Sequence, residues 1–222
     1  MLGLVTFLGL IGLALAVFYG ARQVLGAPAW GRSCVKAGSV VALAAASAAC
    51  GAPWLLVAAL LVSAVGDWML SRPGDSAFLV GVAAFASAHM AYAALFLSLP
   101  EGGLNHFGAG SAVIGGALLI LGLAMAVVLW PRAGALRGPV LAYLAVILCM
   151  GCAALAVPRT GALWLELPGA VLFVASDTVL AFERFVIRAD HPAARGMAGF
   201  IWGSYWSAQA LFTLAFCLQS FR

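Results

Sequence analysis

The chain has 222 residues, of which 65% are hydrophobic and only 8% charged, with a formal net charge of +4. A soluble domain carries about 25% charged residues, so this composition excludes an ordinary soluble protein and indicates an integral membrane protein. The positive charge is scattered, without basic runs and interleaved aromatic residues, which argues against a nucleic-acid partner. Because no linker, charged tail or low-complexity tract divides the sequence, we expect a single membrane domain over residues 1–222.

Hydropathy predicts an all-α fold. A bilayer core about 30 Å thick requires about 20 apolar residues per helix. Charges, Pro and Gly divide the chain into eight expected transmembrane helices in one bundle, over residues 2–20, 35–50, 53–70, 77–99, 111–130, 139–157, 163–184 and 197–219. The first segment lacks the basic start and cleavage site of a signal peptide, so we interpret it as a helix. Cys149 and Cys152 form a CxxC within the sixth segment, where small packing residues are expected rather than a metal or redox site.

The basic residues predict the orientation. The first, third, fifth and seventh connections carry Arg22, Arg32, Lys36, Arg72, Arg132, Arg137, Arg184, Arg188 and Arg195. The opposite side carries only Arg159 and Arg222. Since cytoplasmic loops are enriched in Lys and Arg, we expect both termini on the non-cytoplasmic side. The expected location is the bacterial inner membrane.

Two aspartates, Asp67 and Asp177, lie inside segments that otherwise span the membrane. A carboxylate in hydrocarbon costs at least about 2.5–3.5 kcal/mol, so it seldom lies there without a partner or a function. At about 1.5 Å per residue, they lie about 7 Å and 10 Å inside the cytoplasmic edge. We therefore expect an intramembrane polar pocket that opens sideways or toward the cytoplasmic leaflet. Its two carboxylates are expected within about 8 Å of each other, a separation that leaves room for one water.

Other polar residues are predicted to face this pocket. They are Lys36, Ser63, His89, Tyr92, Tyr143, Ser176, Tyr205 and Gln209. Ser63 with Asp67, His89 with Tyr92, and Tyr205 with Gln209 have the spacing of residues on one helix face. Each has a structural alternative: Asp67 pairing with Lys36 or Arg72, and the His, Tyr and Ser residues acting as packing groups with satisfied hydrogen bonds. Four acidic residues are expected to be solvated: Asp75, Glu101, Glu166 and Asp190.

Two segments carry the aspartates in recognisable motifs. The first reads SAVGDWML over residues 63–70 and is followed by Phe78, Gly81, Phe85, His89 and Tyr92. The second reads GAVLFVASDTVLA over residues 169–181 and is followed by Phe185 and by YWSAQ over residues 205–209. These motifs, with Lys36 at the start of the second helix, resemble the YhhN/TMEM86 family over nearly the whole chain. The departures, Ala37 where Pro is common and Glu183 where a neutral residue is frequent, leave the aspartates untouched.

The resemblance implies a lysoplasmalogenase that needs no cofactor or metal. Such an enzyme cleaves the vinyl ether bond of lysoplasmenyl-ethanolamine or -choline, a lysophospholipid drawn from the membrane lipids. The products are a fatty aldehyde and glycerophospho-ethanolamine or -choline. Vinyl ethers hydrolyse through protonation of carbon and an oxocarbenium ion, a state that two carboxylates also serve in glycosidases.

In this scheme Asp177, the deeper carboxylate, is the acid and Asp67 is the base. Lys36 lies at the mouth of the pocket, apart from the proton-transfer groups, and holds the phosphate. Tyr143, Tyr205, Gln209 and His89 orient water and the ether oxygen.

Two other functions remain open. A proton-coupled transporter would use the aspartates as relays, and flux into proteoliposomes tests this. A metal-dependent lipid hydrolase would hold its ion with the aspartates and His89, although helix rise places His89 about 8–10 Å deeper. Sensitivity to chelators tests that alternative.

Overall fold

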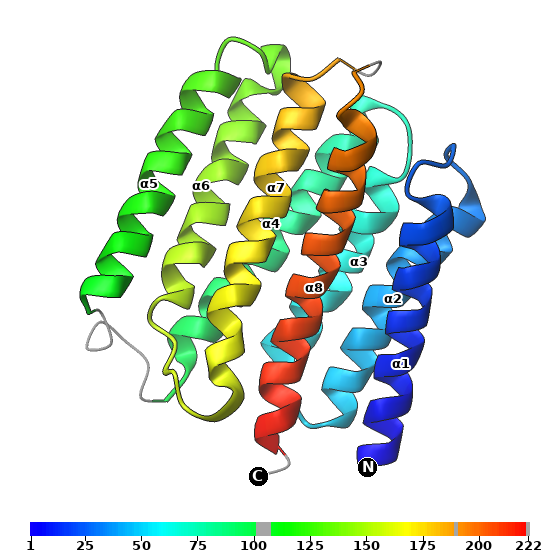
Figure 1. Cartoon of the computed structure of the whole chain (residues 1–222), viewed down its shortest axis with the longest axis vertical. Helices are drawn as coiled ribbons and strands as arrows, with labels where there is room; N and C mark the ends of the chain where they lie inside the picture. The colour runs from blue at the N-terminus through cyan, green and yellow to red at the C-terminus, as the bar shows by residue number, and fades with distance from the viewer. Residues whose placement is uncertain (101–107, 189–190, 221–222) are drawn as a thin grey trace.

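The protein is an up-and-down array of α-helices, seen here in a computed structural model that describes residues 1–100, 108–188 and 191–220 (Figure 1). The helices of these ranges are α1 Leu2–Phe18, α2 Trp30–Ala49, α3 Trp54–Leu70, α4 Asp75–Ser98, α5 Ala109–Leu129, α6 Arg137–Ala154, α7 Glu166–Phe185 and α8 Ala194–Ser220. A π-helical turn, Tyr19–Gln23, extends α1, and 3-10 turns at Gly134–Leu136 and Gly161–Leu165 precede α6 and α7. No strand occurs in the described ranges, so the all-α prediction is confirmed there. Glu101, Asp190 and Arg222 lie outside them.

Among the described residues, five helical segments are long and apolar enough to cross a membrane by length and composition. They are Leu2–Gln23, Asp75–Ser98, Ala109–Leu129, Gly134–Ala154 and Gly161–Phe185. Helix α3 is apolar but shorter. Each of the eight predicted segments corresponds to a helix, and the largest difference is at α2, which begins at Trp30 instead of residue 35. Ala29 has an extended backbone and precedes the first residue of that helix. The predicted start was too late because Arg32 was taken as a boundary, whereas a charged residue near a helix end does not break the helix.

The helices lie side by side along their length, with α5 and α1 at opposite edges (Figure 1). Along the chain α1 packs on α2, α2 on α3, and α3 on α4, and α4 then packs on α6. Helix α7 packs on α8, and α8 returns to contact α2. This return brings Trp202 of α8 to α1, where its indole N–H donates to the Ala16 carbonyl at 3.0 Å. The last helix therefore closes the bundle on the first two.

The centre of the bundle is a cluster of aromatic rings. Phe85 of α4 meets Phe173 of α7 and Tyr205 of α8 edge to face, with centroids 6.4 and 5.6 Å apart. Such geometry stabilises beyond area burial by about 0.5–1.5 kcal/mol per pair. Gly66 of α3 makes room for this cluster, since a Cβ there would lie 2.6 Å from the Phe85 ring. The aromatic core thus holds α3, α4, α7 and α8 around the level of the two aspartates.

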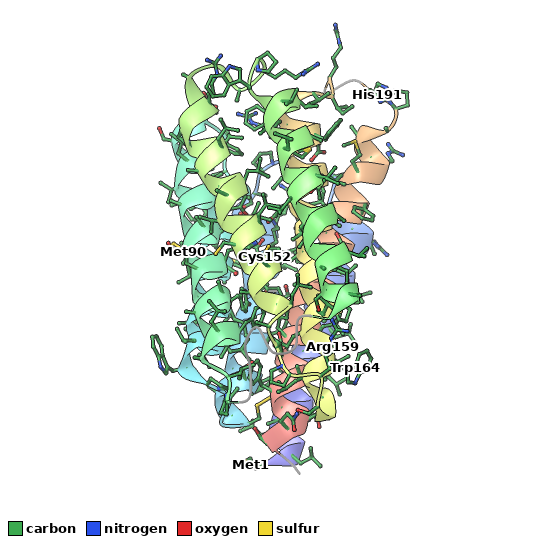
Figure 2. All side chains as sticks on the ribbon, turned by 90° about the vertical axis from the view of Figure 1, so that its left-hand side faces the viewer. Met1, Met90, Cys152, Arg159, Trp164 and His191 are labelled. Atoms are coloured by element: carbon green, nitrogen blue, oxygen red, sulfur yellow. A yellow bond between two sulfur atoms is a disulfide. The ribbon has the colours of Figure 1, made fainter. Side chains whose placement is uncertain are left out.

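The end of the bundle that holds the start of α1 also carries a disulfide. Cys50, after α2, is bonded to Cys217 near the end of α8, with their Cα atoms 5.4 Å apart. Met1, Arg159 and Trp164 lie at this end and His191 lies at the other (Figure 2). The disulfide was not predicted from the sequence. Cys149 and Cys152 are free thiols, and Cys149 is exposed.

Candidate active site

Asp67 is held by groups from two other helices. It lies in the last turns of α3 with 1% of its surface exposed. The Nζ of Lys36, from α2, lies 3.0 Å from its Oδ1. The Tyr205 hydroxyl, from α8, donates to its Oδ2 at 2.7 Å. An ammonium and a phenol together favour the ionised carboxylate, because both offer protons to its oxygens.

Asp177 is held differently. It lies on α7, and the Tyr143 hydroxyl of α6 donates to its Oδ2 at 3.0 Å. The Nε2 of His89, from α4, lies 3.2 Å from the same oxygen. Among the described residues no lysine or arginine forms a salt bridge with this carboxyl.

His89 lies between Asp177 and a backbone carbonyl. The other ring nitrogen of His89, Nδ1, lies 2.7 Å from the Phe85 carbonyl oxygen. A carbonyl only accepts hydrogen bonds, so Nδ1 carries a hydrogen. A hydrogen bond between Nε2 and the Asp177 carboxyl would need a second proton, either on the imidazole as a cation or on the carboxyl as a neutral acid. His89 and Asp177 are therefore arranged as a pair that can store an acidic proton within the bundle.

The two aspartates line one cavity. Its volume is about 220 Å³. Besides the two aspartates, its wall includes polar and charged groups from four elements: Tyr19, Arg32, Lys36, Ser176, Glu183 and Tyr205. The Ser176 hydroxyl donates to the Ile201 carbonyl at 3.0 Å and so also ties α7 to α8. The arrangement provides a polar space between helices with a carboxyl group on each of two walls.

Three of the expected site residues lie behind this cavity. The Tyr92 hydroxyl donates to the Gln209 side-chain oxygen, and both residues are fully buried. Ser63 is also fully buried. None of these three is among the residues that line the cavity with Asp67 and Asp177. Gln209 is one helical turn from Tyr205, so this buried polar layer supports the tyrosine that contacts Asp67.

Two expectations about position are wrong. Lys36 does not stand apart from the carboxylates but contacts Asp67 directly. His89 is not far below the aspartates, because it contacts Asp177. Side chains tilt toward the N-terminus of their own helix, and α4 and α7 run in opposite directions. His89 and Asp177 therefore lean toward each other and close the gap that helix rise alone implies.

Sequence reasoning missed Tyr19, Arg32 and Glu183 on the cavity wall. It also missed the burial of Glu166. Glu166 was expected to be solvated, yet it is fully buried at the start of α7. Neither carboxylate oxygen has a hydrogen-bond partner in the described part of the chain. The signal was present, because Glu166 falls inside the predicted segment 163–184 and the argument applied to Asp67 applies to it equally.

The same side chains can be compared with the ligand set of a metal site. Within residues 1–100, 108–188 and 191–220, no three or more His, Cys, Asp or Glu side chains are grouped to hold an ion. His89 and Asp177 form a pair without a third such ligand in that set.

Comparison with known proteins identifies the family. The model of the YhhN family matches residues 31–216 of this chain. The chain belongs to the YhhN family. This result confirms the resemblance drawn from the motifs around Asp67, Asp177 and Tyr205. No solved structure was found to match the chain.

Relatives in this family come from bacteria and mammals. The chain is 36% identical to the lysoplasmalogenase of Mycobacterium bovis over 164 residues, 72% of this chain and 59% of the relative. It is 38% identical to the lysoplasmalogenase TMEM86B of Sus scrofa over 197 residues, 85% of this chain and 76% of the relative. It is 34% identical to TMEM86B of Homo sapiens over 161 residues, 72% of this chain and 62% of that protein. The match thus spans about three fifths of the length of the mycobacterial YhhN relative.

Proposed function

We propose that this YhhN protein is a membrane lysoplasmalogenase that hydrolyses the vinyl ether bond of lysoplasmenyl lipids. Its relatives named lysoplasmalogenase support the reaction class. The observation that carries the proposal is that Asp67 and Asp177 line one cavity but have different partners. Acid-catalysed hydrolysis needs such an unlike pair, one group to give a proton and one to accept a proton.

Asp67 is the base in this proposal. Lys36 and Tyr205 place a cation and a hydroxyl donor on its two oxygens, and in this proposal the ionised form stabilises a cation and accepts a proton from water. Asp177 is the acid, because the His89–Asp177 pair already requires a proton that it can release. Tyr143 holds the acid carboxyl in position.

The reaction follows in three balanced steps. Asp177 transfers its proton to the alkenyl carbon β to oxygen, and the double bond supplies the electron pair of the new C–H bond, which leaves an oxocarbenium ion. Water adds to the carbon bonded to oxygen, and Asp67 accepts one of the water protons. The resulting hemiacetal then collapses as the bond to the glycerol oxygen breaks, this oxygen gains a proton and the hemiacetal hydroxyl loses one. The proton on Asp67 returns through cavity water to Asp177, so the net change consumes one water.

The remaining polar groups bind and support the substrate in this scheme. Lys36 and Arg32 line the cavity and supply positive charge for the phosphate of the head group. Ser176 lies on the same wall. Ser63, Tyr92 and Gln209 form a buried polar layer, in which Gln209 is one helical turn from Tyr205, the donor to Asp67.

We further propose that all eight helices cross the membrane. Helix α2 has 20 residues and α8 has 27, so at about 1.5 Å per residue both are long enough for a core of about 30 Å. The 17 residues of α3 reach about 25 Å, and the helix lies between α2 and α4 in the array. The aspartate cavity then opens toward the cytoplasmic leaflet and both termini face outward.

Two independent features support this orientation. The basic connections follow the distribution of cytoplasmic loops. The Cys50–Cys217 disulfide lies at the end that would face the oxidising bacterial periplasm, where disulfides persist. The test is a reporter that is active only in the cytoplasm, fused after α8. Activity of this reporter would overturn the orientation.

Purified protein in nanodiscs tests the function. Wild-type protein is expected to release fatty aldehyde from lysoplasmenyl-ethanolamine or -choline and none from the saturated alkyl-ether lysolipid of equal length, which has no double bond to protonate. Unchanged activity in the presence of a chelator separates this reaction from a metal-dependent one. Failure to release aldehyde from either vinyl ether lipid, in preparations that remain folded, would refute the proposal.

A further inference from the structure

A second recess reaches Asp177 from the opposite side of α7. It is a groove between α5, α6 and α7, edged by Phe78 and Val82 of α4. Its walls are apolar along most of their length: Leu121, Met125, Leu129, Val140, Leu144, Ile147, Leu148, Val174, Leu180, Ala181 and Phe185. We call this set the apolar groove. The groove is lined by α5, the helix at one edge of the array in Figure 1, and its volume is about 50 Å³.

Polar groups in the apolar groove are concentrated beside the aspartate. The Tyr143 hydroxyl and Asp177 are bonded to each other. Thr178 donates to the Val174 carbonyl in its own helix, so its hydroxyl is already used. Arg184 pairs with Asp75 at 2.8 Å, where both side chains are largely exposed at the surface. Between these two points the groove offers hydrocarbon surface.

Asp177 is the carboxyl group that lines both compartments. On one side it shares the polar cavity with Asp67, Lys36 and Arg32. On the other side it closes the apolar groove. A carboxyl at the boundary between a polar cavity and an apolar groove is placed where an amphiphile changes from polar to apolar.

We propose that the apolar groove binds the alkenyl chain of the lysolipid while the polar cavity binds its glycerophospho-head group. This inference rests on the proposed function and extends it to the substrate's position. The bond that breaks joins the chain to the glycerol oxygen, so it must lie where the two compartments meet. The carbon that receives the proton belongs to the chain, which places it beside Asp177, whereas Asp67, Lys36 and Tyr205 face the water and head-group side. Acid and base roles therefore follow from the two compartments.

The inference predicts dependence on chain length through groove residues. Leu121 of α5 lines the groove, whereas Leu123, two residues along, is exposed to the surroundings and does not. Leu121→Trp fills the groove and Leu123→Trp adds the same bulk on the lipid-facing side. Loss of contact with about two methylene groups, at about 0.8 kcal/mol each, corresponds to about tenfold weaker binding.

Binding is measured with saturated alkyl-ether lysolipids, which cannot be cleaved, in nanodiscs by competition with a labelled lysolipid. Leu121→Trp is expected to weaken binding of a long-chain analogue about tenfold and of a short-chain analogue less than about twofold, with Leu123→Trp unchanged. Equal effects of the two variants, or equal loss for long and short chains, would overturn the inference. Ala181→Phe in the groove, with Ala124→Phe on the exposed face of α5 as its control, gives a second test if Leu121→Trp does not fold.

The outcomes separate the two proposals. If the wild type binds the analogues with the expected groove dependence but releases no aldehyde from vinyl ether lipids, the proposed function fails and the binding groove stands. If the wild type releases aldehyde but groove and control variants behave alike, the function stands and the groove assignment fails.

Discussion

Asp67 and Asp177 occupy similar places in the sequence but unlike surroundings in the structure. Each follows a small residue in an apolar helix, Gly66 and Ser176, and both line the same cavity. Asp67 contacts a lysine and a tyrosine, whereas Asp177 contacts a tyrosine and a histidine. Lysine compensates a charge permanently, and histidine exchanges a proton near neutral pH. The two carboxyls therefore have unlike partners, and this difference is what the proposed acid–base catalysis requires.

The largest expected effect comes from removing either carboxyl. Asp67→Asn and Asp177→Asn preserve shape but cannot exchange a proton, so each is expected to lower aldehyde release about 10²–10⁴-fold. Initial rates on lysoplasmenyl-ethanolamine measure this, with thermal unfolding in detergent as the control for folding. If either variant keeps more than about a tenth of the wild-type rate, its carboxyl is not an essential acid or base, which contradicts the two-carboxylate mechanism.

Replacing Lys36 tests how much its contact with Asp67 contributes to the free energy of unfolding. Lys36→Met leaves the Asp67 carboxylate buried without a cation, and breaking a buried pair in this way costs about 3–5 kcal/mol. The double variant Lys36→Met with Asp67→Asn is expected to regain most of this loss, because no uncompensated charge remains. Unfolding free energies of the four proteins of this cycle measure the coupling. Additive losses would show that the contact between Nζ and Oδ1 contributes no coupling energy.

The partners of Asp177 are expected to act on rate more than on stability. His89→Gln keeps a hydrogen-bonding side chain but cannot carry the shared proton, so kcat is expected to fall at least about tenfold. Tyr143→Phe removes one hydrogen bond, worth about 0.5–1.5 kcal/mol, and is expected to reduce kcat by about threefold to tenfold. Rates over a range of pH separate the two variants, since only His89→Gln should change the shape of the profile. An unchanged profile in His89→Gln would contradict the proton-sharing assignment.

Glu166 should show the smallest effect, and it tests whether the carboxyl function is confined to the two aspartates. Glu166→Gln removes an ionisable group that has no cationic partner among the described residues, so the rate is expected to stay within about twofold and the stability to stay equal or rise. Aldehyde release and unfolding measure both quantities. A large loss of activity without loss of folding would add Glu166 to the chemistry and enlarge the site beyond the aspartate cavity.

The sequence predicted the helices and several site partners well. Apolar runs separated by Pro, Gly and charges mark helices directly, so the segment that became α7 and the place of Asp177 in it could be predicted. The pairings of Asp67 with Tyr205 and Asp177 with Tyr143 lie among the expected site residues. Polar side chains in apolar helices are few, and they satisfy one another because lipid offers no alternative partner.

The remaining contacts depend on packing that spacing does not contain. The contact of His89 with Asp177 depends on the opposite tilt of side chains on antiparallel helices, which a count of residues along each helix ignores. The place of Glu166 inside the segment 163–184 was a signal of its burial, but the contact of the turn before α7 with α8 could not be predicted from the sequence. Cys50 and Cys217 both fall near the same expected end of the bundle, but only the closure of α8 onto α2 brings them together.

Isotope incorporation during turnover tests the central claim most directly. Wild-type protein is incubated with lysoplasmenyl-ethanolamine in D₂O or in H₂¹⁸O, and the aldehyde is reduced at once to stop exchange. Protonation of the alkenyl carbon by a solvent-exchanged Asp177 carboxyl predicts a single deuterium on the carbon next to the former aldehyde, with no ¹⁸O in the glycerol hydroxyl. Absence of that deuterium, or ¹⁸O in the glycerol product, would contradict carbon protonation and with it the division of acid and base between Asp177 and Asp67.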